Sequence, residues 1–93
     1  MNAWIETASG NLLNAAVVNA IAVKETTPGG PWEVGAATGS APSPIATGLA
    51  DRPAAERVRN ALAIRISTTC TADTPQIIRY NPATATVCAV DLD

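Results

Sequence analysis

The stretch from Trp4 to Val23, WIETASGNLLNAAVVNAIAV, decides the fold that this sequence predicts. An extended segment begins at Trp4, and Ser9-Gly10-Asn11 supplies residues that tolerate the positive φ of a tight turn. Aliphatic and β-branched side chains, which favour strands, return at Leu12 and continue to Val23. The stretch therefore predicts two strands joined by a turn, followed by a third and longer strand.

Two further strands are predicted after this stretch. The loop Lys24 to Pro31 contains Pro28-Gly29-Gly30-Pro31, which the interior of a strand or helix does not accept. Trp32 to Thr38 alternates large and small side chains, as a half-buried strand does. Ile45 to Leu49 is short and follows prolines, which suits the edge of a sheet. We expect a small curled antiparallel sheet of about five strands.

One amphipathic helix is predicted from about Arg52 to Ile66. Asp51 is a candidate N-cap, and Pro53 suits the first helical turn because its missing N–H costs little there. Apolar residues recur at three- and four-residue steps through Val58 and Leu62, with polar residues on the opposite side. Val58 and Leu62 are therefore expected to face the core.

The C-terminal part predicts a polar connector, Ser67 to Pro75, and a β-hairpin. The two strands are Gln76 to Asn81 and Thr86 to Leu92, and Asn81-Pro82-Ala83-Thr84 has the composition of a type I turn. These strands are too apolar to remain unpaired. These strands either extend the sheet of their own chain or pair with another copy of the chain. We favour the second arrangement, in which two copies exchange their hairpins.

The length of 93 residues leaves room for a single domain, 1–93, with the sheet and helix in 1–66 and the connector and hairpin in 67–93. The hydrophobic fraction of 47% is carried largely by alanine, since the chain has no Phe, one Tyr and two Trp. Alanine buries little apolar surface, so the core is expected to be thin. A partner subunit would complete it, which predicts a homo-oligomer, a dimer or higher, with another protein as the alternative partner.

Charge and hydropathy exclude several partners. The net charge of −2 removes the long-range attraction that nucleic acids and anionic membranes need. No apolar run approaches the ~20 residues of a membrane span. The first residues lack the basic and apolar regions of a secretory signal. We therefore expect a cytoplasmic protein without a membrane partner, and nucleic acid is not the favoured partner.

The residues that common catalytic sites need are missing or scattered. There is no histidine, which removes the commonest general base and the commonest transition-metal ligand. Cys70 and Cys88 are too few for a zinc site, and a reducing compartment keeps both as thiols, with a disulfide between them as the alternative. We expect no enzyme, no metal site and no cofactor.

A resemblance rests on Trp4-Ile5-Glu6-Thr7 with Gly10, on Leu13-Asn14, on Trp32 at the start of a strand and on the helix from Asp51. In this pattern the chain resembles short uncharacterised bacterial proteins that open Trp-Ile-x-Thr-x-x-Gly. The resemblance covers roughly the first 66 residues. It implies a curled antiparallel sheet followed by one helix, similar in outline to small pleckstrin-homology-like or SH3-like barrels, and it implies no activity.

Two classes of function fit these observations. The first is a small non-catalytic interaction or oligomerisation module, because the composition predicts a core in need of partners. Its candidate interaction surface consists of Trp32, Tyr80, Ile78 and Val90. The alternative is a small-ligand or nucleic-acid binding domain that uses Trp4, Trp32 or Tyr80 as a stacking surface.

Overall fold

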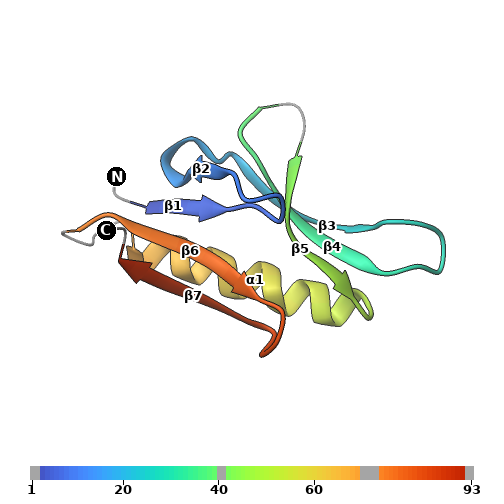
Figure 1. Ribbon diagram of the computed structural model, residues 1–93. Coiled ribbons are helices and arrows are strands. Elements are labelled where there is room, and N and C mark those ends of the chain that lie inside the picture. Colours follow the sequence, from blue (N-terminus) through green and yellow to red (C-terminus); the bar gives the residue numbers. More distant parts are fainter. Residues whose placement is uncertain (1–2, 40–41, 70–73, 92–93) are drawn as a thin grey trace.

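The computed structural model describes residues 3–39, 42–69 and 74–91 (Figure 1). The elements are, in chain order, β1 (Ala3–Glu6), β2 (Leu12–Asn14), the 3-10 helix η1 (Ala15–Val17), β3 (Ala20–Glu25), β4 (Trp32–Ala37), β5 (Pro42–Leu49), α1 (Arg52–Thr69), β6 (Gln76–Asn81) and β7 (Thr86–Asp91). Their strands form a four-stranded sheet in the order β2-β1-β6-β7 and a three-stranded sheet in the order β3-β4-β5. The predicted α+β class is confirmed.

The prediction that about five strands form a single sheet is wrong, because η1 separates the first two strands from the next three. The Oδ1 atom of Asn14 accepts a hydrogen bond from the N–H of Ala16 at 2.9 Å and caps η1. The chain turns there, so the third strand, predicted within the run that continues to Val23, begins only at Ala20. β1 and β2 consequently belong to a different sheet from β3, β4 and β5.

The C-terminal hairpin is confirmed, and it extends the sheet of its own chain. β6 pairs antiparallel with β7 from Gln76 opposite Asp91 to Asn81 opposite Thr86. On its other side β6 pairs with β1 in parallel, with Ile5 opposite Ile78. In this chain the hairpin thus pairs with its own β1, as in the alternative, and the favoured exchange with another copy stays a prediction.

The helix α1 has the predicted start and a later end. The Oδ1 atom of Asp51 accepts a hydrogen bond from the N–H of Ala54 at 2.9 Å, as an N-cap does. Ser67–Thr69, predicted as connector, are helical, and the Thr69 hydroxyl donates to the Arg65 carbonyl oxygen at 2.6 Å. This bond satisfies the hydroxyl of Thr69, which is buried. Residues 70–73 of the predicted connector lie outside the described residues.

The core lies where α1 packs against both sheets. The helix contacts β6 and β7 of one sheet and β3, β4 and β5 of the other, and it passes behind the hairpin in Figure 1. The largest fully buried side chains are Ile5, Val34, Leu62 and Ile78. Much of the remaining core is alanine, as expected: Ala3, Ala15, Ala36, Ala37, Ala46 and Ala55 are all buried.

Candidate functional site

The four-stranded sheet has an inner face against α1 and an outer face on its opposite side. Because successive side chains of a strand point to opposite faces, Ile5, Ile78 and Val87 lie on the inner face, where all three are buried. Their neighbours Trp4 and Ile77 lie on the other side. Neither of these two packs against the hydrophobic core.

Apolar side chains form a row across this outer face. Trp4 on β1 is opposite Ile77 on β6, and Ile77 is opposite Val90 on β7. Trp4 and Ile77 are half-buried, while Val90 is 40% exposed. Leu12 on β2 shares the face and is 42% exposed. The outer face, defined as Trp4, Leu12, Ile77, Cys88 and Val90, is thus an apolar surface of the sheet.

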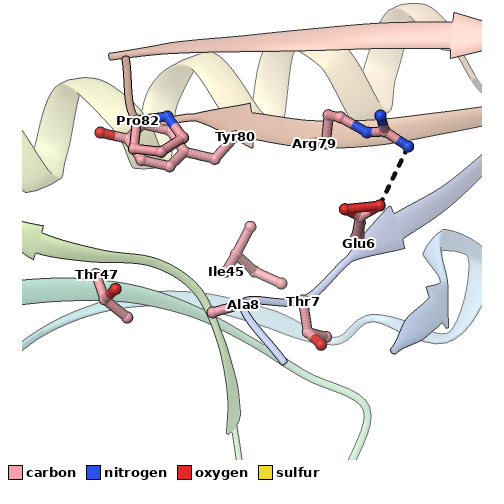
Figure 2. Close-up of a pocket in the computed structure, with 8 residues that line it drawn as sticks. All are labelled: Glu6, Thr7, Ala8, Ile45, Thr47, Arg79, Tyr80 and Pro82. Atoms are coloured by element: carbon pink, nitrogen blue, oxygen red, sulfur yellow. Dashed lines mark ion pairs between the residues drawn. The ribbon is translucent and has the colours of Figure 1, made fainter. Parts of the chain in front are cut away.

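An ion pair lies beside the apolar row. The Nη2 atom of Arg79 lies 3.1 Å from the Oε1 atom of Glu6 and joins β6 to β1 (Figure 2). Leu12 is opposite Glu6, and Cys88 is opposite Arg79. The two opposite charges leave no net charge on this part of the face.

The structure does not bring the four predicted surface residues together. Val90 lies on the outer face, but Ile78 is fully buried on the inner face, so its assignment to an interaction surface is wrong. Trp32 is in the other sheet, half-buried, with its ring centroid 5.8 Å from the guanidinium carbon of Arg52. Tyr80 shares the face of Ile78 and packs against the core.

Sequence reasoning named Trp4 only as a stacking residue in the alternative function, and it missed Leu12 and Ile77 as members of the outer face. One feature of the sequence could have indicated this face. Ile77 and Ile78 are adjacent in a predicted strand, so their side chains must point to opposite faces. One of these two large apolar side chains had to lie away from the core. The alternation also places Val90 on the side of Ile77, since the two residues are opposite each other.

A small pocket lies where β5 approaches the ends of β1 and β6. It has a volume of about 250 Å³ and is lined by Glu6, Thr7, Ala8, Ile45, Thr47, Arg79, Tyr80 and Pro82. Figure 2 shows Arg79 and Tyr80 on β6 and the side chain of Ile45 between the strands. The Nε atom of Arg79 is buried and has no hydrogen-bond partner among the residues that the structure describes. The pocket could therefore take a small molecule that accepts a hydrogen bond.

A second hollow, of about 380 Å³, lies between α1 and β7. Arg57 on the helix, the turn residue Ala85, and Thr86 and Val87 at the start of β7 are among the residues that line it. Arg57 is exposed, and no ion pair forms between it and the other residues that the structure describes. The guanidinium of Arg57 therefore lies beside the β7 edge of the sheet without an ion pair to the described residues.

Within residues 3–39, 42–69 and 74–91, no group of three or more His, Cys, Asp or Glu side chains could hold a metal ion. Cys88 is a free thiol, as expected, and Cys70 lies outside the described residues. No helix in the described part of the chain is long and apolar enough to cross a membrane. Comparison with models of protein families, with curated proteins and with solved structures finds no match to this chain.

Proposed function

We propose that this chain is a small non-catalytic interaction module that acts by self-association. The outer face is the observation that carries the proposal. Trp4, Ile77 and Val90 form a continuous apolar row on a sheet face, and contiguous apolar surface of this kind marks a site of protein interaction. Covering it with a partner would gain about 25 cal/mol for each Å² of apolar surface removed from water.

The composition of the core supports the same proposal. Alanine fills many of the buried positions, and each buried alanine contributes less stabilisation than a larger apolar side chain. A chain of 93 residues also buries a smaller fraction of its surface than a larger domain does. Association that buries further apolar surface stabilises such a fold through mass action.

The test is light scattering over a range of protein concentrations. The wild-type chain is expected to have a mass above the 9.5 kDa of one copy. Val90→Lys should lower that mass, because it places a charge on the outer face and on strand β7. Ala83→Lys adds the same charge in the exposed turn before β7 and serves as the matched control. A wild-type mass of one chain at every concentration would contradict the proposal.

The pocket in Figure 2 favours a second candidate function, the binding of a small ligand next to Tyr80. Among the described residues, the buried Nε of Arg79 has no hydrogen-bond partner, which a ligand with an acceptor oxygen would supply. The experiment is an NMR titration with acetate. Saturable shifts confined to residues that line the pocket, and lost in Arg79→Gln, would support this function. Shifts that do not saturate would exclude binding of this probe.

A further inference from the structure

Among the described sheet edges, the strand β7 has the fewest features that prevent further strand pairing. β2 has only 3 residues, and it leads directly into η1. The edge strand β3 carries the charged pair Lys24-Glu25. β5 contains Pro42 and Pro44, and its register with β4 shifts. Short length, charges, prolines and bulges are the means by which edges avoid pairing.

β7 has none of these features along most of its length. It has 6 residues, TVCAVD, with no proline or lysine, and its charge is confined to Asp91 at its end. β6 occupies one side of β7, and β7 is the last strand in its sheet. The backbone N–H and C=O groups on its other side are therefore available to another strand.

We propose that β7 pairs antiparallel with β7 of a second copy around a twofold axis at Cys88. This inference rests on the proposed self-association and adds to it a contact at the β7 edge, which joins the outer faces of two copies side by side. Each Thr86 is then opposite the partner's Val90, and each Val87 is opposite the partner's Ala89. Opposed residues in antiparallel strands share a face, so the inner faces and the outer faces of the two sheets each become continuous.

The charges select this register over its neighbours. Moving the axis to Ala89 places each Asp91 carboxylate opposite the partner's Val87, which is a buried apolar residue. Moving it to Val87 shortens the paired region to three residues, 86–88, before the turn interrupts it. The register at Cys88 avoids both costs and keeps the two carboxylates at opposite ends of the interface.

The same register brings opposite charges together. It places the partner's Asp91 just beyond the paired residues 86–90, beside the turn residue Ala85. Ala85 and Arg57 line the same hollow between α1 and β7. The carboxylate of Asp91, which accepts a hydrogen bond from the Nε2 atom of Gln76 at 3.1 Å in its own chain, then lies near the guanidinium of the partner's Arg57, and the twofold axis repeats the pair. This complementarity is the reason to choose a second copy of this chain as the partner of β7 over an unrelated strand.

Cysteine cross-linking tests the register. Opposed residues of antiparallel strands have Cα atoms about 4.5–5.5 Å apart, within the span of a disulfide. In a Cys70→Ser chain, diamide is expected to convert the two Cys88 thiols to a disulfide by accepting their two electrons and two protons. The control, Cys70→Ser/Cys88→Ser/Ala83→Cys, moves the thiol into the turn. Cys88 should cross-link at least about tenfold faster, because facing thiols have a high effective concentration.

Charge exchange tests the partner contact. Arg57→Glu and Asp91→Arg should each weaken the dimer by about tenfold, because each change alters two symmetric ion pairs. The combination Arg57→Glu/Asp91→Arg should restore most of the wild-type affinity. Sedimentation equilibrium measures the dissociation constants, and circular dichroism checks that each variant folds.

The outcomes separate this inference from the function on which it rests. Selective cross-linking at Cys88 with rescue in the double variant supports the pairing of β7. A dimer that shows neither result associates through another surface, which overturns the inference and leaves the proposed function standing. A monomer at all concentrations overturns both.

Discussion

The guanidinium of Arg79 on β6 lies 3.1 Å from the carboxylate of Glu6 on β1, so an ion pair joins strands from opposite ends of the chain. The two side chains are 42% and 34% exposed, and solvent therefore screens their attraction. In a double-mutant cycle with Glu6→Gln and Arg79→Gln, we expect a coupling free energy of under about 1 kcal/mol. Urea unfolding provides the measurement. Added sodium chloride should reduce the coupling further, and a value unchanged by salt would contradict this account.

The helix is expected to stabilise the fold through its buried side. Leu62 is fully buried between α1 and the sheets, so Leu62→Ala should cost about 2 to 5 kcal/mol of unfolding free energy. Arg65→Ala, at an exposed position of the same helix, should cost under about 0.5 kcal/mol. Chemical denaturation of both variants makes the comparison. Equal losses would show that the helix does not bury Leu62.

Local sequence signals predicted most elements of this fold. The turn at Ser9-Gly10-Asn11, the N-cap at Asp51 and the alternation from Trp32 each depend on a few neighbouring residues. The pairing of β1 with β6 depends on residues far apart in the sequence. Alternation reports that a strand has a buried face, but it does not report which strand lies beside it. The division into two sheets was therefore missed.

The sequence predicted only part of the candidate site, because the pairing of distant strands decides which residues are buried. Val90 was correctly placed on the surface, and Ile78 was not. The sequence shows that the adjacent residues Ile77 and Ile78 face opposite ways. Which of them meets α1 depends on the register with β1, where Ile5 and Ile78 are opposite each other. Periodicity alone does not carry that register.

The two isoleucines provide a direct test of this assignment. Ile78→Ala removes a fully buried side chain and should cost about 2 to 5 kcal/mol of unfolding free energy. Ile77→Ala, one residue earlier and on the outer face, should cost under about 1 kcal/mol in the monomer. Thermal and urea unfolding at low protein concentration measure both. The reverse order of losses would place Ile77 in the core and reject the outer face.

The N-cap of α1 should contribute measurably to stability. Asp51→Ala removes the oxygen that accepts from the Ala54 N–H at 2.9 Å and should cost about 1 kcal/mol. Asp51→Asn keeps an acceptor at the same position and is the matched control, with a smaller expected loss. Urea unfolding compares the two variants. Equal losses from alanine and asparagine would show that the lost charge, and not the capping bond, is responsible.

Truncation after Thr69 tests whether the C-terminal hairpin belongs to the core of its own chain. The shortened chain loses Ile78 and Val87, which are buried against α1, and leaves β1 paired only with the short strand β2. An isolated two-stranded hairpin is marginal in water, so we expect the truncated chain to be unfolded. Circular dichroism and NMR dispersion report the result. Refolding on addition of a peptide covering residues 70–93 would show that the hairpin completes the core by binding β1. A truncated chain that folds alone would mean that residues 3–69 form a stable unit without β6 and β7.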